Sequence, residues 1–297
     1  MYPRAFHYHR AGSLQEASAM LSEFGDEAKV LAGGQSLIPL MKLRYANPKH
    51  LVDLNFIDGA SYIREEARTL CFGALTRHAE IERSPAAAKI PIIHDCAAGI
   101  ADVQVRNRGT IGGSLAEADP SGDWATVLMT LETEVRCQKR GGDRRLPLGD
   151  FIKDAYTTAL AHDELVSEVV VKIPPTDSGG AYLAFKRSAP VYPTASAAVQ
   201  LTMDGEICKD AVIALGCVGL TAIKAKDSEA ALRGQRLTEK TLAAAVEAAR
   251  TAADPQSDMR GSADYKRVLA GSLVRRAIDI AVRRARGEKV EAGHIYA

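Results

Sequence analysis

Two glycine pairs, each followed within two residues by a serine, constrain this chain more than any other feature of its sequence. The first is in "LAGGQSLIPLMKLR", where an apolar run leads into Gly33 and Gly34. The second is in "GTIGGSLAEADPSGDW", which starts at Gly109. Glycine allows a sharp turn and lets a ligand approach with no Cβ in the way. One glycine suffices for a turn, so a pair at the end of a strand-like run indicates a second requirement.

Both junctions fit the sequence pattern of an anion-binding loop. Exposed N–H groups just before a helix attract anions, because the helix dipole adds positive potential there. Neither junction matches G-x-G-x-x-G, and neither carries the lysine of a P-loop. Two such loops in one domain would suit a diphosphate held between them. On spacing alone, the alternative of two plain tight turns is favoured.

The composition narrows the class of protein. A chain of 297 residues suits two or three domains, and 46% hydrophobic with 25% charged residues is typical of a globular protein. A formal net charge of +1 gives no indication of nucleic-acid binding. The N-terminus lacks the apolar core of a signal peptide, and no apolar run is long enough to cross a bilayer. We therefore expect a cytoplasmic protein without a transmembrane segment.

The five cysteines argue against a redox metal in this chain. They are odd in number and scattered, without a C-x-x-C motif, at Cys71, Cys96, Cys137, Cys208 and Cys217. A disulfide framework, a zinc site or an iron–sulfur cluster would need pairs or groups of thiols. Isolated thiols with apolar neighbours are usually core residues.

Local patterns predict a mixed succession of helices and strands. Ser13 can cap a helix over 13–25, with Glu16 placed as in a capping box and Gly25 ending it. Short strands are expected at 28–32, 50–57 and 69–76, and a helical stretch over 77–101 broken at its prolines. After "PPTDSGG" (174–180) the pattern predicts a meander of strands that ends with "AIKAKDSEAAL". Two helices are expected after it. The last helix carries a basic face, interpreted as solvated surface with a partner contact as the alternative: Arg275, Arg276, Arg283, Arg284 and Arg286.

A few polar residues could have either an ordinary structural role or a functional one. His7 and His9 could form a metal pair, but no third ligand is evident, so ordinary surface or core histidines are favoured. Asp119 and Asp123 could bind Mg²⁺ with a nucleotide. Their place after "TIGGS" favours a flavin contact for Asp123 and a turn or capping role for Asp119. His94 and Asp95 beside Cys96 are interpreted as coincidence.

Three motifs together resemble a known family. "LAGGQSLIPLMKLR", "TIGGSLAEADPSGD" and "AFKRSAPVYPTASAA" are similar, in order and spacing, to the FAD-binding medium subunits of the molybdenum hydroxylases. This is the xanthine dehydrogenase family, and the pattern is most like that of its aerobic carbon monoxide dehydrogenase branch. The resemblance runs nearly end to end, from "FHYHR" to "YKRVLAGSLVRRAI".

The resemblance implies an α+β fold. A two-part FAD-binding domain of the vanillyl-alcohol-oxidase (PCMH) type is expected over 1–176, with subdomains of about 1–57 and 58–176. A small C-terminal domain like that of the CO dehydrogenase flavoprotein is expected over 177–297, with a three-stranded antiparallel sheet and helices.

It also implies a non-covalent FAD site. The first loop lies on the FAD diphosphate in the family, which carries over to Ala32, Gly33, Gly34, Gln35, Ser36 and Leu37. The second loop also contacts FAD, which carries over to Thr110, Gly112, Gly113 and Ser114. Asp123 matches an acid that contacts the cofactor, and Ile100 an apolar contact. Lys186 matches a flavin-side contact and Tyr192 a tyrosine near the isoalloxazine ring, with a packing tyrosine as the alternative.

Two positions depart from the common pattern. Ser114 stands where asparagine is frequent, and "SAPVYPTA" stands where an acidic or "GDY" turn is frequent.

The implied activity is electron transfer within a three-chain enzyme. A large subunit would carry the molybdenum–molybdopterin cofactor and oxidise the substrate, and a small one two [2Fe–2S] clusters. This chain would bind FAD, which passes electrons to quinone, NAD⁺ or O₂, in a dimer of heterotrimers associated with the inner face of the membrane through its partners. A CO dehydrogenase is the first expectation, and a xanthine or purine, nicotine or aldehyde dehydrogenase the alternative. A free-standing FAD oxidoreductase and a cofactor-free interaction protein are the alternatives from other classes.

Overall fold

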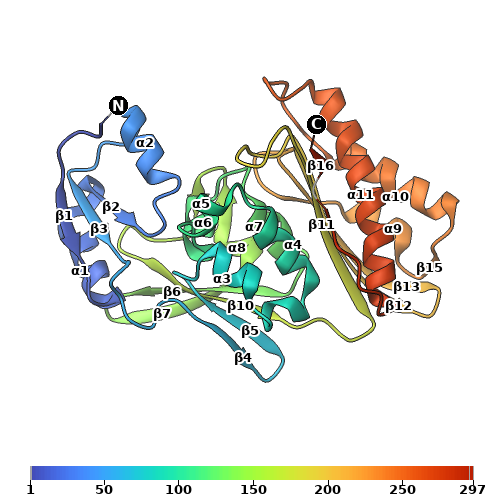
Figure 1. Cartoon of the computed structure of the whole chain (residues 1–297), viewed down its shortest axis with the longest axis horizontal. Helices are drawn as coiled ribbons and strands as arrows, with labels where there is room; N and C mark the ends of the chain where they lie inside the picture. The colour runs from blue at the N-terminus through green and yellow to red at the C-terminus, as the bar shows by residue number, and fades with distance from the viewer. Residues whose placement is uncertain (1, 294, 297) are drawn as a thin grey trace.

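The computed structural model describes residues 2–293 and 295–296. Figure 1 shows three successive parts: a small N-terminal sheet at one side, a central antiparallel sheet with helices above it, and a C-terminal sheet with helices at the other side. The two glycine loops lie in the first two parts.

The N-terminal part is a three-stranded parallel sheet in the order β1-β3-β2. Ser13 caps α1 by accepting from the amide of Glu16 at 3.1 Å. The Glu16 carboxylate accepts from the amide of Gly12 at 2.7 Å, so the expected capping box is shifted by one residue. The elements are β1 His7–Arg10, α1 Leu14–Phe24, η1 Gly25–Glu27, β2 Ala28–Leu31, α2 Leu37–Leu43 and β3 His50–Asp53.

The central part is a five-stranded antiparallel sheet in the order β4-β5-β10-β6-β7. Proline ends or starts its helices as expected, since Pro91 is the first residue of α4. Its strands are β4 Ile63–Glu66, β5 Thr69–Gly73, β6 Thr133–Lys139, β7 Gly142–Pro147 and β10 Leu165–Lys172, with a β8 Ile152–Asp154 and β9 Thr157–Thr158 pair beside them. Its helices are α3 His78–Arg83, η2 Ala87–Lys89, α4 Pro91–Gly99, α5 Val103–Arg106, α6 Ile111–Glu117, α7 Asp123–Leu128 and α8 Leu148–Phe151.

Three long antiparallel strands form the C-terminal sheet, as the resemblance implies. They are β11 Ser178–Lys186, β12 Ala195–Asp204 and β13 Ile207–Gly216, and the short strands β14 Ile223–Lys224, β15 Gln235–Arg236 and β16 Ile295–Tyr296 extend them. The helices are α9 Lys226–Leu232, α10 Glu239–Ala252 and α11 Ala263–Ala285. The division at 176/177 stays a prediction, with β10 ending before it and β11 starting after it.

Several local predictions were wrong in extent or type. The strands expected at 50–57 and 69–76 end at Asp53 and Gly73. The segment "AIKAKDSEAAL", expected as part of the strand meander, is mainly helix α9. Only its two residues of β14 form a strand. The following residues become helical because they pack against α10 and β13.

The basic face of α11 is also not a uniformly solvated surface. The Arg284 side chain is only 8% exposed, and its guanidinium binds both carboxylate oxygens of Asp95 in α4, at 2.6 and 2.9 Å. It donates as well to the carbonyls of Gly180 and Val290. Arg275 pairs with Glu239, and Arg283 with Glu288. Arg284 therefore joins the C-terminal domain to the central part through a buried ion pair.

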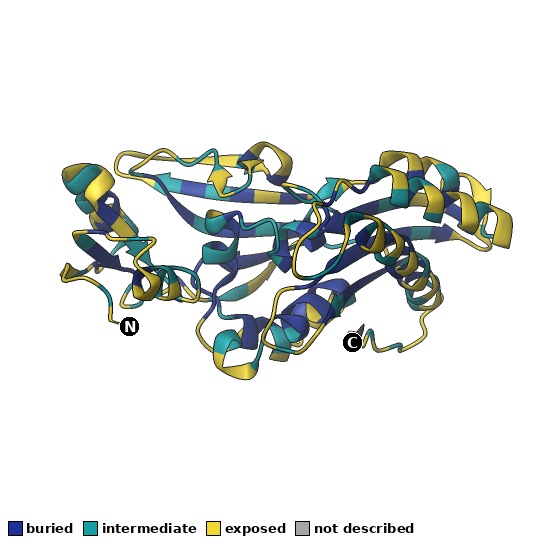
Figure 2. Cartoon of the chain, turned by 90° about the horizontal axis from the view of Figure 1, so that it is seen from above, coloured by how far each residue is buried: buried dark blue, intermediate teal, exposed yellow. Residues whose placement is uncertain are grey.

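Three apolar clusters form the core, and the central one is shared with the C-terminal sheet through Tyr182, Ala184, Ala198 and Ala214. Figure 2 shows the buried residues concentrated between the helices and the sheets, while loop and outer helix faces are exposed. The five cysteines are all unpaired, and four of them are buried. His7 stacks on His50, whose Nδ1 lies 2.9 Å from Nε2 of His9.

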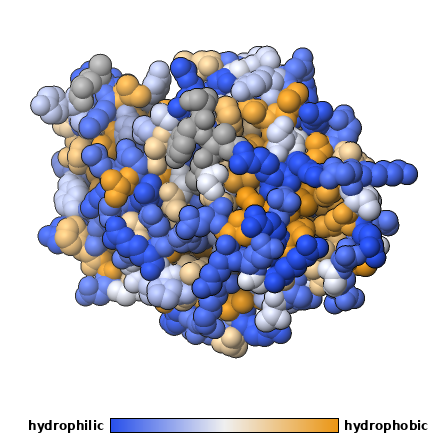
Figure 3. Space-filling view, turned by 45° about the vertical axis from the view of Figure 1, so that its right-hand side comes forward, coloured by the Kyte–Doolittle hydropathy of each residue, from blue (hydrophilic) through white to orange (hydrophobic). Residues whose placement is uncertain are grey.

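The surface seen from the C-terminal side is mixed. In Figure 3, hydrophobic residues (orange) lie in groups among hydrophilic ones (blue). No helix in the part of the chain that the structure describes is long and apolar enough to span a membrane.

Candidate functional site

A cavity of about 550 Å³ lies where the two glycine loops and the start of the C-terminal domain meet. This volume is in the range of small-molecule sites. Thirteen of the fourteen residues predicted to bind FAD line it, all except Gly112: Ala32, Gly33, Gly34, Gln35, Ser36, Leu37, Ile100, Thr110, Gly113, Ser114, Asp123, Lys186 and Tyr192. Residues more than 150 positions apart in the sequence are thus brought to one cavity.

The first loop presents backbone amides that the protein itself does not use. Among the described residues, no acceptor pairs with the amides of Gly33, Gly34, Gln35, Ser36 or Leu37. Gly34 has a φ of 73°, a left-handed conformation that favours glycine. Ser36, which precedes α2, makes no side-chain capping bond. A run of free amides beside a cavity is suited to an anionic group.

The two loops touch each other at Gly33. A Cβ on Gly33 would lie 2.7 Å from Cα of Gly109 and would also meet the carbonyl oxygen of Arg108. Gly33 is therefore required by the backbone contact between the loops, in addition to any ligand.

In the second loop, a side chain of the loop itself accepts a hydrogen bond from a loop amide. The Thr110 side chain caps α6 by accepting from the amide of Gly113 at 3.1 Å. Gly112 is buried, and a Cβ there would lie 2.7 Å from the carbonyl oxygen of Ala74. Gly112, predicted to contact FAD, is not among the residues that line the cavity and packs against Ala74 behind the loop, so its contact stays a prediction.

Three buried polar side chains, Asp123, Tyr182 and Lys186, interact at one end of the cavity. Tyr182 donates from its hydroxyl to Oδ1 of Asp123 at 2.6 Å. Nζ of Lys186 lies 4.0 Å from the same carboxylate oxygen and donates to the carbonyl of Gly99, next to Ile100. Burial raises the pKa of Tyr182, and the Asp123 charge acts in the same direction. Asp123 and Lys186 thus form a fixed, satisfied ion pair whose remaining surface lines the cavity.

Tyr192 lies at the mouth of the cavity and is 45% exposed. The Arg260 guanidinium lies 5.9 Å from the centre of its ring. Burial raises its pKa, followed by the charge of Asp119 and a hydrogen bond to it. Asp119, expected as a turn residue, accepts from the amide of Ser121 at 2.8 Å and also lines the cavity.

Family models cover nearly the whole chain. The FAD binding domain in molybdopterin dehydrogenase matches residues 4–175, and the CO dehydrogenase flavoprotein C-terminal domain matches residues 180–281. The chain belongs to this family. It is an FAD-binding subunit of the carbon monoxide dehydrogenase and xanthine dehydrogenase family of oxidoreductases, and the expectations from the resemblance on family and fold are confirmed.

Two relatives are similar in sequence to this chain over nearly the full length of both proteins. The carbon monoxide dehydrogenase medium chain of Afipia carboxidovorans is 41% identical over 96% of this chain and 100% of its own. The 6-hydroxypseudooxynicotine dehydrogenase complex subunit alpha of Paenarthrobacter nicotinovorans is 38% identical over 99% of this chain and 100% of its own.

Solved structures show the same fold. A structure of the carbon monoxide dehydrogenase from Hydrogenophaga pseudoflava has a TM-score of 0.93 at 40% identity, over 96% of this chain and 99% of that one. The quinoline 2-oxidoreductase of Pseudomonas putida 86 has a TM-score of 0.91 at 35% identity, over 96% of this chain and 99% of that one.

Sequence reasoning missed several polar groups in the cavity of this FAD-binding subunit, His78 among them. His78 is buried and accepts at Nδ1 from the indole N–H of Trp124, at 3.1 Å. Burial lowers the pKa of His78 to about 3, and the charges of Arg77 and Arg106 act in the same direction. The imidazole is therefore neutral and carries its proton on Nε2, which packs against Gly109. No local motif around His78 could have indicated this, because its partner is 46 residues away.

Proposed function

We propose that FAD binds non-covalently in the cavity between the two glycine loops, with its diphosphate on the first loop. The observation that carries this assignment is the run of amides from Gly33 to Leu37, which have no acceptor among the described residues and line the cavity. They are suited to phosphate oxygens because several unpaired N–H groups beside one cavity can stabilise an anion.

We assign the other residues by their place around the cavity. Thr110, Gly113 and Ser114 would bound the second side of the cofactor, and Gly112 would support them from the core. Ile100, Asp123 and Lys186 would lie on the flavin side, where the buried ion pair fixes the local charge. Tyr192 would cover the open end, since its ring is partly exposed at the cavity mouth.

When bound, FAD would supply redox chemistry that links one-electron donors to an acceptor such as quinone, NAD⁺ or O₂. What this chain contributes is binding, orientation and a controlled charge around the ring. No group of three or more His, Cys, Asp or Glu side chains is placed to hold a metal ion within the described residues.

We propose that the complete enzyme is a heterotrimer, doubled into a dimer of heterotrimers. A large subunit would carry the molybdenum–molybdopterin cofactor, and a small subunit the [2Fe–2S] clusters. Support comes from the relatives, which are named as medium chains or as subunits of dehydrogenase complexes. A cytoplasmic location, with attachment to the inner face of the membrane through partners, is part of this proposal.

We propose carbon monoxide as the substrate of the complex, because the two carbon monoxide dehydrogenase medium chains are 41% and 38% identical to this chain. A nicotine-type substrate is the second candidate, since the 6-hydroxypseudooxynicotine relative is 38% identical over almost the full length. Purines and aldehydes are further alternatives.

The decisive experiment is co-expression with a large molybdenum-type subunit and a small cysteine-rich subunit. The chain should copurify with both and complete electron transfer from CO to a dye. Isolated, metal-free protein should bind FAD and leave CO, purines and aldehydes unoxidised; turnover near the rate of the complex would support a free-standing flavoenzyme instead. Colourless protein that takes up no added FAD would support an interaction protein.

The non-covalent link has its own test. Acid precipitation should release all of the flavin into the supernatant, because neither glycine loop contains a histidine or cysteine that could tether it. Yellow colour kept in the pellet would contradict this assignment.

A further inference from the structure

The two glycine loops are joined, outside the cavity, by a chain of side-chain hydrogen bonds. Arg77, the N-cap of α3, donates from one guanidinium nitrogen to the carbonyl of Arg108 and from another to Oδ1 of Asn55. Asn55 donates from Nδ2 to the carbonyl of Ala32 at 2.8 Å. A single Arg–Asn pair therefore holds one carbonyl from the start of each loop.

The orientation of the Asn55 amide follows from its partners. Its Nδ2 faces the carbonyl of Ala32 and Oδ1 of Asp53, both of which can only accept. Its Oδ1 faces the guanidinium of Arg77, which can only donate. The buried Asp53 is held in turn by the amide of Asn55 at 2.8 Å and by the hydroxyl of Tyr8 at 2.6 Å. The chain is thus anchored in the N-terminal sheet.

These bonds decide where the loop amides point. In a trans peptide the C=O and N–H groups point in opposite directions, and the described residues contain no cis peptide. Asn55 does not line the cavity, so the carbonyl of Ala32 is directed out of it and the amide of Gly33 the other way. Arg77, also outside the cavity, holds the carbonyl of Arg108 at the place where it touches Gly33.

The charge of Arg77 has a second consequence. The carbonyl oxygens of Ala32 and Arg108 would repel a phosphate near the loops if they were free to rotate toward it. Bonding to Asn55 and to the Arg77 cation fixes these oxygens and neutralises part of their negative charge.

We propose that Arg77 and Asn55 are positioning residues for FAD. They join the loop of the N-terminal sheet to the loop of the central part, and so preorganise the amides that would bind the diphosphate. This inference rests on the proposed function in placing FAD in this cavity. Neither residue touches the cofactor in this assignment.

The test uses the full-length protein freed of FAD, titrated with FAD and followed by flavin fluorescence. Asn55→Ala and Arg77→Ala should each raise the Kd about tenfold or more, on the scale of partners that orient the groups around a bound cofactor. The double variant should raise the Kd by less than the product of the two single effects, because Arg77 and Asn55 are bonded to each other. A full product would show that the two residues act independently and would overturn the proposal.

Asn55→Asp separates positioning from packing. It keeps an acceptor for Arg77 but cannot donate to the carbonyl of Ala32, so it should bind FAD as weakly as Asn55→Ala. Arg77→Lys keeps the charge but cannot reach both acceptors, and it should give a weakened Kd even where Arg77→Ala fails to fold. Wild-type affinity in both conservative variants would overturn the proposal.

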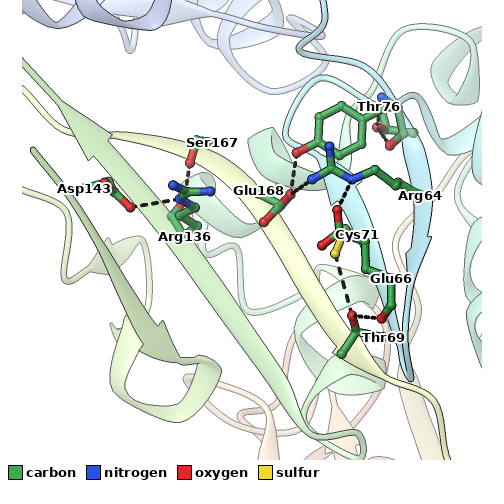
Figure 4. A network of polar contacts seen from close by, with 10 residues as sticks. Arg64, Glu66, Thr69, Cys71, Thr76, Arg136, Asp143, Ser167 and Glu168 are labelled. Carbon is green, nitrogen blue, oxygen red and sulfur yellow. Dashed lines mark hydrogen bonds and ion pairs between the residues drawn. The ribbon is translucent and has the colours of Figure 1, made fainter.

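A second hydrogen-bond network, on the central sheet, provides a matched control. Figure 4 shows Arg64 beside Glu168, and the two are joined at 3.1 Å. Like Arg77, Arg64 is a partly exposed arginine in a hydrogen-bond network, but neither Arg64 nor Glu168 lines the cavity. Arg64→Ala should lower the thermal midpoint of the FAD-free protein and leave the Kd for FAD unchanged.

The outcomes distinguish the two proposals. Wild-type protein that binds no FAD would overturn the proposed function. Wild-type protein that binds FAD, with Asn55 and Arg77 variants that bind it equally well, would overturn only the positioning role.

Discussion

The two glycine loops have nearly the same sequence, "AGGQSL" and "IGGSLA", and meet different physical demands. In the first, Gly33 is needed where the two loops touch and Gly34 for its positive φ, and the amides that follow have no acceptor in the described part of the chain. In the second, Gly112 is needed because Ala74 lies behind it, and Thr110 uses the following amide for a helix cap. Similar motifs therefore meet different demands: the first loop leaves its amides unpaired beside the cavity among the described residues, and the second uses an amide for a helix cap and packs against the core.

Of the substitutions considered, Gly33→Val should have the largest effect, a loss of FAD affinity. Its Cβ would collide with the backbone at Gly109, which would push the loops apart and misplace the free amides. We expect FAD affinity to fall by about 100-fold or more while far-UV circular dichroism shows a folded chain. Gly142→Val, on a strand with no atom within 4 Å of the new Cβ, is the matched control and should bind normally. Normal flavin content in Gly33→Val would show that the loop is only a turn.

Gly112→Val should act on stability instead. The added side chain would enter a packed core beside Ala74, and such overpacking typically destabilises by about 1–3 kcal/mol. Urea unfolding of the FAD-free protein measures this difference, and the folded protein should keep an FAD affinity closer to wild type than that of Gly33→Val. An unchanged free energy of unfolding would mean that the glycine is not needed for packing.

His78, packed against the second loop, should make the protein acid-sensitive. Its folded pKa of about 3 lies below the ordinary value of 6.5, so the unfolded chain binds a proton that the folded chain does not. The free energy of unfolding should therefore fall as the pH drops below about 6.5, by about 2 kcal/mol at pH 5 from this residue. His78→Asn keeps an acceptor for Trp124 and should lose this part of the drop between pH 7 and pH 5. An equal drop in both proteins would contradict the assignment.

The smallest expected difference concerns the helix caps. Thr110→Ala removes a side-chain cap and should lower the free energy of unfolding by about 1 kcal/mol. Ser36→Ala, in the first loop, removes no capping bond and should change it by no more than about 0.5 kcal/mol. Chemical denaturation of the FAD-free proteins compares the two, and equal losses would remove the distinction between a presenting loop and a structural one.

Local patterns were enough to find both loops, the cap at Ser13 and the long helix α11. Glycine pairs, capping residues and helical spacing act over a few neighbouring positions, so they can be seen in a sequence. The motifs in order and spacing also indicated the family, and with it a set of site residues of which all but Gly112 line one cavity.

Only the tertiary structure decided what each loop residue does. Arg77 reaches Asn55 across 22 positions and Arg108 across 31, and Arg284 reaches Asp95 across 189. The environments of Gly33, Gly112 and His78 likewise depend on segments distant in the chain. No periodicity encodes such pairings, because they arise from how the three sheets pack against each other. A glycine pair in the sequence therefore predicts a loop with little room, whereas the fold determines whether a ligand, another loop or the core lies beside it.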